Sequence, residues 1–206
     1  MEEVELISGV YVSRETFERL EAFRDLVLKW TARINLVSTK SAATLWDRHI
    51  LDSAQLIQHA PDSFNRWVDL GSGGGFPGIV VATLNLDLAP DAEMILVESD
   101  QRKATFLRAA IRELGLNAQV QASRAETLAP MQADVLTARA LASLSELLPL
   151  ASRHLKPDGI AIFPKGRSAL DEIRDAQQGW TFQLEQSPSK TDAEAAILKL
   201  ERIERV

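Results

Sequence analysis

The chain has 206 residues, enough for one α/β domain with room for an appendage, and its formal net charge is −6. It contains no cysteine, which excludes disulfides, zinc–thiolate centres and thiol catalysis. The acidic segment Met1–Glu5 has no apolar core, and no apolar run approaches the length of a membrane span. We therefore expect a cytoplasmic protein without a signal peptide, transit peptide or membrane anchor.

Residues 1–60 are predicted to form a helical extension that belongs to one compact unit with the domain at 61–206. Ser13 can cap a first helix. The apolar stripe of that helix consists of Phe17, Leu20, Phe23, Val27, Trp30 and Ile34. Asn35 and the segment 36–38 break it. A second helical stretch is expected over 42–59, and Pro61 ends it.

The most informative stretch is the glycine-rich turn at 71–78. It follows a short apolar run at 67–68, which predicts a buried strand, and it precedes an apolar helix. Pro77 suits the first turn of that helix, since its missing N–H costs nothing there. Glycines let the backbone turn tightly and let a ligand approach it, so we expect a nucleotide-like ligand.

Two ligand templates fit these glycines. Gly73, Gly75 and Gly78 satisfy the dinucleotide fingerprint G-x-G-x-x-G. Asp69, Gly71, Gly73 and Gly75 match the first motif of S-adenosylmethionine-dependent methyltransferases, an acid followed by x-G-x-G-x-G. An acid at the strand end suits a ligand with an ammonium and a sulfonium better than a pyrophosphate, so the second template is favoured. A plain turn without a ligand is the alternative.

The next strand, predicted at 94–97, ends in Glu98. A carboxylate at this position can accept hydrogen bonds from both ribose hydroxyls of a nucleotide, although a solvated acid is the alternative. The spacing of apolar residues then predicts a helix over 101–114, and Gly115 ends it.

Strands and helices continue to alternate down the chain. We expect strands at 118–121, 134–137 and 159–163, a helix near 143–155, and a closing antiparallel pair at 180–186 and 195–203. This alternation predicts a doubly wound, mostly parallel sheet with its ligand at the carboxyl ends of the strands. By this rule four further residues are expected at the site. Ala125 and Glu126 follow the third strand, where the adenine of a nucleotide-like cofactor should lie, Arg139 follows the fourth and Lys165 the fifth. Glu126 could instead be an ordinary helix-terminal acid.

Basic residues concentrate in two stretches of this acidic chain, 29–49 and 139–167. The first holds Lys29, Arg33, Lys40 and Arg48 with His49 beside them. Such stretches favour a face that meets phosphates, although ordinary surface scatter explains them equally well.

Five segments occur in an order that resembles a known family: 35–38 (Asn-Leu-Val-Ser), Arg48–Ser53, 69–78, 139–144 and 164–166. The chain resembles the bacterial small-subunit ribosomal RNA methyltransferase G family, also called glucose-inhibited division protein B, over roughly residues 15–170. The block Arg48–Ser53 together with Phe76–Gly78 is the specific part. Phe76 stands where the family often has leucine, and either residue can pack against a cofactor.

The resemblance implies a Rossmann-like class I methyltransferase fold, an α/β fold with a mostly parallel seven-stranded sheet and an N-terminal helical extension. It implies that S-adenosylmethionine methylates N7 of one guanosine, conventionally numbered 527, in the 530 loop of 16S rRNA. The implied cofactor contacts are Gly71, Gly73, Gly75, Phe76, Glu98, Ala125, Glu126 and Arg139. The implied RNA-side residues are Asn35, Arg48, His49, Asp52, Ser53 and Lys165.

No residue is assigned as a catalytic acid or base, because guanine N7 reacts without losing a proton, and no metal is expected. The expected partner is 16S rRNA or the small ribosomal subunit, bound by a monomer. A small-molecule S-adenosylmethionine-dependent methyltransferase is the main alternative and predicts a closed pocket without a basic face. A nicotinamide oxidoreductase and a non-catalytic RNA-binding protein are the others.

Overall fold

A seven-stranded sheet forms the centre of the protein in the computed structural model, which describes residues 4–38 and 42–206. Its strand order is β5-β4-β3-β6-β7-β9-β8. The first five strands are parallel, β9 pairs antiparallel with β7, and β8 pairs antiparallel with β9. The strands are β3 (Arg66–Leu70), β4 (Glu93–Val97), β5 (Ala118–Gln121), β6 (Ala133–Ala138), β7 (Leu155–Lys165), β8 (Trp180–Pro188) and β9 (Ala196–Arg205). This confirms the predicted fold class.

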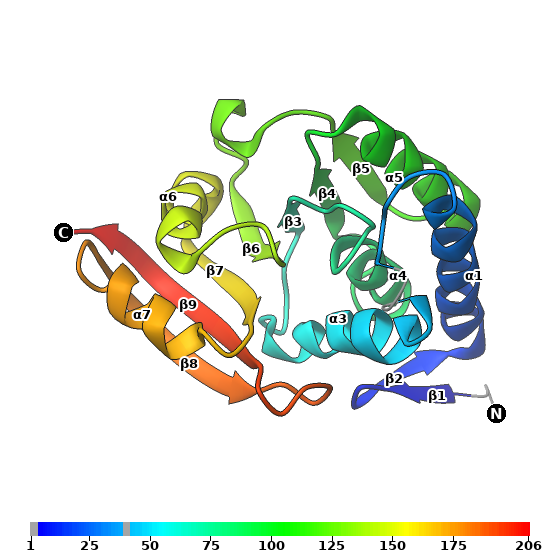
Figure 1. The fold of residues 1–206 in the computed structure, drawn as a ribbon, viewed down its shortest axis with the longest axis horizontal. Helices are drawn as coiled ribbons and strands as arrows, with labels where there is room; N and C mark the ends of the chain where they lie inside the picture. The colour runs from blue at the N-terminus through cyan, green and yellow to red at the C-terminus, as the bar shows by residue number, and fades with distance from the viewer. Residues whose placement is uncertain (1–3, 39–41) are drawn as a thin grey trace.

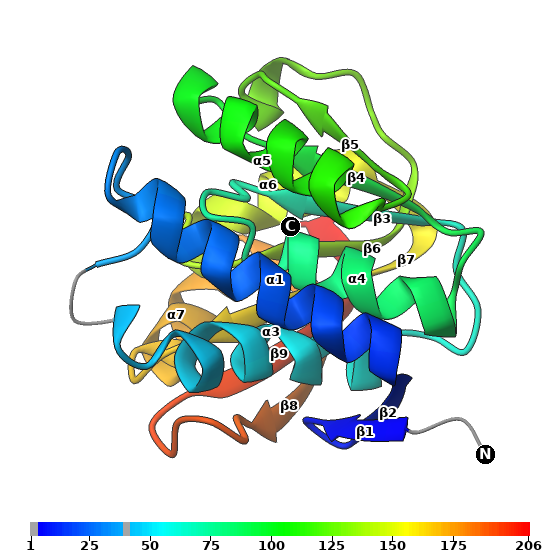
Figure 2. The same cartoon turned by 90° about the vertical axis from the view of Figure 1, so that its right-hand side faces the viewer.

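Helices cover both faces of the sheet (Figure 1). One face carries α1 (Arg14–Thr31), α4 (Gly78–Leu88) and α5 (Gln101–Leu114), and the other carries α6 (Leu144–His154) and α7 (Ala169–Ala176). Three short helices, η1 (Trp46–Leu51), α3 (Asp52–Ala54) and η2 (Gln55–His59), run on from one another beside α4. Figure 2, which faces this side, shows α1 crossing it with α3 alongside.

The strands bury both of their faces because residues along them alternate between two apolar cores. In β3, Trp67 packs with α1, α4 and α5, whereas its neighbour Val68 packs with α6. The α1 side chains Leu20 and Phe23 are fully buried in the first of these cores. The N-terminal helices are therefore packed on the sheet through one continuous hydrophobic core.

Several predicted elements have the expected bounds. The helix at 101–114 and the strand at 118–121 match residue for residue, and Gly115 ends the helix in the left-handed conformation. Ser13 caps α1, its hydroxyl accepting a hydrogen bond from the Thr16 amide at 3.2 Å. The closing strands pair in antiparallel fashion, as predicted.

The N-terminus adds an element that was not predicted within the helical extension at 1–60. Val4–Ile7 (β1) and Val10–Ser13 (β2) form an antiparallel hairpin before α1. Ser8 and Gly9 turn it with positive φ, and β-branched residues on either side favour extended backbone. Helix α1 also ends at Thr31, before Ile34, so the expected stripe is one residue too long.

Helix α7 was not predicted. Its apolar residues Ala169, Ile173 and Ala176 are buried against α6, but two of the three are alanines, so the sequence shows only a weak stripe. The helix is important for the site, because Glu172 on it faces β7.

Candidate functional site

The glycine turn lies between β3 and α4, at the carboxyl end of the parallel sheet. Gly71, Gly73 and Gly75 have φ angles of +67°, +53° and +87°, which residues with side chains rarely adopt. A Cβ on Gly75 would lie 2.8 Å from the Phe23 ring, so the turn packs directly on α1. The backbone path favours glycine at all three positions, and close packing also requires it at Gly71 and Gly75.

Asp69 does not face a ligand, contrary to the interpretation of the motif's acid. Its side chain is 0 % exposed, and Oδ1 accepts a 2.8 Å hydrogen bond from the Thr137 hydroxyl, which in turn accepts one from the Trp67 indole at 3.0 Å. Burial raises the pKa of Asp69 to about 6, and the hydrogen bond from Thr137 offsets part of that shift. The residue ties β3 to β6 beneath the glycine turn.

Glu98 closes the other side of the turn, at the end of β4. Its carboxylate oxygens accept hydrogen bonds from the backbone amides of Gly73, at 2.8 Å, and of Asp100, at 2.7 Å. A carboxylate oxygen can accept a second hydrogen bond, so Glu98 keeps acceptor capacity for a ribose hydroxyl.

A cavity of about 210 Å³, which we call the Ala125 cavity, lies next to this turn. Residues that line it include Gly71, Ser99, Ala125, Glu126 and Leu141. Ala125 begins the short helix η3 (Ala125–Thr127), and its carbonyl is 3.0 Å from Nε2 of the buried His154. The structure thus brings together Gly71, Ala125 and Glu126, which were predicted to contact the cofactor.

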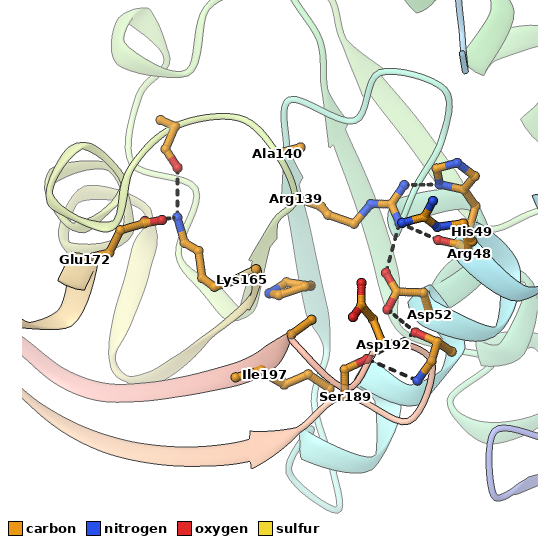
Figure 3. Close-up of a pocket in the computed structure, with 16 residues that line it drawn as sticks. Arg48, His49, Asp52, Arg139, Ala140, Lys165, Glu172, Ser189, Asp192 and Ile197 are labelled. Carbon is orange, nitrogen blue, oxygen red and sulfur yellow. Dashed lines mark hydrogen bonds and ion pairs between the residues drawn. The ribbon is translucent and has the colours of Figure 1, made fainter. Parts of the chain in front are cut away.

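A larger cavity of about 520 Å³, which we call the Arg139 cavity, opens on the other side of the segment 139–142 (Figure 3). Ala142 lines both cavities. Residues from six parts of the chain line it, among them Arg48, His49, Asp52, Arg139, Lys165 and Asp192. Four predicted RNA-side residues therefore share one cavity with Arg139.

Arg139 is the centre of this cavity's hydrogen bonds. Its guanidinium donates to Asp52 Oδ2 at 3.0 Å and to the Arg48 carbonyl at 3.2 Å, and it contacts His49 Nδ1. Its Cζ also lies 5.6 Å from the centre of the Phe76 ring, a cation–π contact with the glycine turn. The side chains of Arg139 and Asp52 are each 17 % exposed, so the pair is largely shielded from water.

His49 is held as a neutral ring. Burial and the positive charge of Arg139 lower its pKa to about 4, against a smaller opposite effect of Asp52. Its Nδ1 faces a donor, the Arg139 guanidinium, and therefore accepts, and its ring lies 4.9 Å from the Phe76 ring. A pKa of about 4 makes His49 a weak proton acceptor.

The loop between β8 and β9 binds the Asp52 oxygen that does not contact Arg139. Thr191 donates to Asp52 Oδ1 at 2.7 Å, and the Gln55 amide donates to the same oxygen at 2.9 Å. The Gln55 amide also reaches Ser189 at 3.2 Å. The sequence analysis missed Gln55, Thr191 and Asp192, because no local motif marks them and the contacts span about 140 residues of chain.

Lys165 lines the cavity but is already paired. Its ammonium donates to Glu172 at 2.7 Å and to the Ala142 carbonyl at 2.8 Å, and the residue is 9 % exposed. Glu172, on the unpredicted helix α7, was also missed. An acid in the first turn of a helix was the available signal.

Two predicted RNA-side residues lie elsewhere. Asn35 is exposed and lines a separate cavity of about 300 Å³ with Arg33, Arg102 and Lys103. Ser53 is fully buried, and its hydroxyl has no hydrogen-bond partner within the described chain.

The two basic stretches are not two continuous faces. Arg48 lies at the Arg139 cavity, whereas Arg33 lies at the separate cavity beside α5, and Lys40 is outside the described residues. In the second stretch, Arg153 and Lys156 line a cavity at the opposite end of β7 from Lys165.

Within residues 4–38 and 42–206, no three His, Asp or Glu side chains are grouped as metal ligands would be. The same part of the chain holds no helix with the length and apolar content that a bilayer crossing requires.

Comparisons with known proteins agree with these features. The family model described as GidB, rRNA small subunit methyltransferase G, matches residues 16–198. The ribosomal RNA small subunit methyltransferase G of Cereibacter sphaeroides is 51 % identical over 201 residues, covering 98 % of both chains. That of Ruegeria pomeroyi is 52 % identical over 195 residues, covering 95 % of both.

Solved structures share the fold at lower identity. M. jannaschii TYW2, solved in complex with AdoMet, matches 100 % of this chain and 87 % of its own with a TM-score of 0.59 and 13 % identity. The ribosomal protein L11 methylase of Lactobacillus delbrueckii subsp. bulgaricus matches 75 % of this chain and 78 % of its own with a TM-score of 0.60 and 18 % identity.

Proposed function

The chain belongs to the rRNA small subunit methyltransferase G family, and from this premise we propose that it methylates N7 of a single guanosine in the 530 loop of 16S rRNA. S-adenosylmethionine is the methyl donor, as expected for a methyltransferase family. The observation that carries the proposal is the pair of cavities on either side of the segment 139–142, one for the cofactor and one for the base.

The residues around the Ala125 cavity fit the cofactor. Glu98 has acceptor capacity for ribose hydroxyls, and the short side chain of Ala125 leaves room for an adenine ring beside Glu126. The glycine turn, Gly71 to Gly75 with Phe76, would carry the cofactor past Ala125 toward Arg139. Arg139 begins the segment 139–142, whose Ala142 lines both cavities.

Methyl transfer to guanine N7 requires the enzyme to position the two reactants, and it requires no proton transfer. When bound, S-adenosylmethionine supplies a methyl group on a positive sulfur, which the N7 lone pair of guanine can attack without losing a proton. His49, neutral at physiological pH, does not need to act as a base. Asp52 and the other carboxylates of the cavity can stabilise the positive charge that develops on the base.

The basic residues of the Arg139 cavity have different proposed roles toward the RNA. Arg48 is exposed and free to meet a phosphate next to the target base, while Lys165, paired with Glu172, shapes the wall. Asn35 with Arg33 and Lys103 would contact the RNA farther away. Because the cavity is recessed, the target base must be splayed out of its loop. With a ribosomal substrate, we expect the protein to work in the cytoplasm.

The test is transfer of labelled methyl groups to small ribosomal subunits, to naked 16S rRNA and to a small-molecule pool, followed by mapping of the modified nucleotide. One N7-methylguanosine in the 530 loop is the expected product, and the preparation that gives it identifies the substrate state. Transfer to the small-molecule pool alone would contradict the proposal and favour a small-molecule methyltransferase.

A further inference from the structure

Three carboxylates line the Arg139 cavity, Asp52, Glu172 and Asp192, and the first two each accept three hydrogen bonds from the protein. Asp52 holds Arg139 at 3.0 Å, Thr191 at 2.7 Å and Gln55 at 2.9 Å. These hydrogen bonds fix the position of the Asp52 carboxylate before any ligand enters.

The Glu172 carboxylate accepts hydrogen bonds from three groups in the wall of the Arg139 cavity. It accepts from Lys165 at 2.7 Å, from the Leu144 amide at 2.8 Å and from the Ser168 hydroxyl at 2.7 Å. Three of its roughly four acceptor positions are thus occupied by the protein, and its charge is paired with Lys165.

Asp192 is different. It sits in the β8–β9 loop, where Oδ1 accepts from the Glu194 amide at 3.0 Å, and within the described residues it has no ion pair. The side chain is exposed, and Figure 3 shows it pointing into the cavity between Lys165 on one side and Asp52 on the other. A carboxylate oxygen with free acceptor capacity thus faces the space proposed for the base.

Resting on the proposed function, we propose that Asp192 is the residue that selects guanine, by accepting hydrogen bonds from its N1–H and its N2 amino group. An ionised carboxylate only accepts, so it requires donors. Guanine presents two adjacent donors, N1–H and N2–H, on its Watson–Crick edge, whereas adenine presents an acceptor at N1. A site built to hydrogen-bond a donor strongly rejects a base that lacks it.

The placement fits the reaction. N7 and the N1–N2 edge lie on opposite sides of the guanine ring, and Asp192 comes from the β8–β9 loop, while the cofactor cavity lies beyond the segment 139–142. Methylation of N7 leaves a positive charge on the ring, which makes N1–H a stronger donor. Asp192 therefore binds the transition state more tightly than the ground state.

The experiment is a double-mutant cycle between Asp192→Asn and removal of the N2 amino group. Small-subunit RNA that carries guanosine or inosine at the target position is methylated by each enzyme, and kcat/KM is measured. Inosine keeps N7, O6 and N1–H but lacks the amine. The wild type is expected to prefer guanosine by about tenfold to a hundredfold, the loss of one hydrogen bond to a charged group. In Asp192→Asn that preference should fall to a few fold, because the asparagine oxygen can accept only a neutral hydrogen bond.

Controls separate this residue's role from the fold and from the proposed function. Glu194→Gln, a neighbouring exposed acid outside the cavity lining, should keep the wild-type preference. Asp192→Ser, measured in parallel, keeps a side-chain oxygen for the Glu194 amide and should behave like Asp192→Asn. An undiminished guanosine preference in both Asp192 variants would overturn the assignment of Asp192 alone. A wild type that makes no N7-methylguanosine would overturn the proposed function itself.

Discussion

The two cavities are built in opposite ways. The Ala125 cavity is lined by segments that directly follow neighbouring parallel strands: Gly71 after β3, Ser99 after β4 and Ala125 after β5. The Arg139 cavity is formed by side chains from distant parts of the chain, with Asp52 bonded both to Arg139 and to Thr191. A cofactor common to many enzymes can be held by a repeated backbone arrangement, whereas a particular substrate needs side chains assembled by the whole fold.

Arg139 lines the Arg139 cavity and contacts Phe76 of the glycine turn, so its loss should have the largest effect. Arg139→Ala removes the partner of Asp52 and the contact with Phe76, and methyl transfer should fall by about a hundredfold or more with the fold intact. Single-turnover transfer and cofactor titration measure it. Arg174→Ala, an exposed arginine paired with Asp171, is the matched control. Unchanged activity in Arg139→Ala would remove the residue from the site.

The second prediction concerns Asp69, the buried acid beneath the glycine turn, and its effect on stability. Its folded pKa, about 6, lies above the ordinary value of 3.8, so the native state holds the proton more tightly than the unfolded state does. The free energy of unfolding of the wild type, relative to Asp69→Asn, should fall by up to about 3 kcal/mol as pH rises from about 4 to about 7. Denaturant titrations at several pH values measure it. Asp62→Asn, a change at an exposed residue, serves as the control. A stability difference between the wild type and Asp69→Asn that does not change with pH would contradict the raised pKa of Asp69.

Gly71 and Gly115 form a matched pair with nearly equal φ angles, +67° and +66°. A Cβ on Gly71 would lie 2.6 Å from Leu141 at the Ala125 cavity, whereas one on Gly115 would meet nothing within 4 Å. Each change to alanine should cost about 1–2 kcal/mol of stability. Only Gly71→Ala should also weaken cofactor binding, by about tenfold, because the displaced Leu141 narrows the cavity. Equal affinities in calorimetry would separate Gly71 from the cofactor.

His49 should give the smallest pH effect. With a pKa of about 4 it is neutral across the range in which the enzyme works, so the ratio of kcat/KM between the wild type and His49→Gln should stay constant from about pH 5.5 to about pH 8. A ratio that changes with a midpoint near 6.5 would mean that His49 titrates during catalysis.

The same contrast explains what could be predicted from the sequence. The strands, the α5 helix and its Gly115 end were predictable because apolar periodicity and a positive-φ glycine are local signals. The resemblance implied that Arg48, His49 and Asp52 face the RNA and that Arg139 contacts the cofactor, but it did not indicate that they share one cavity. Gln55, Thr191 and Asp192 were missed because their contacts depend on the position of the loop between β8 and β9. Asp69 was misread since a sequence does not reveal which way a strand-end side chain points.

The most direct test of the two-cavity account is a crystal structure with S-adenosylhomocysteine and a short RNA that carries the target guanosine. The account predicts the adenine beside Ala125, the ribose on Glu98, and the guanine in the Arg139 cavity with its N7 toward the sulfur. An adenosine bound in the Arg139 cavity, or a guanine bound outside it, would contradict the division of the site.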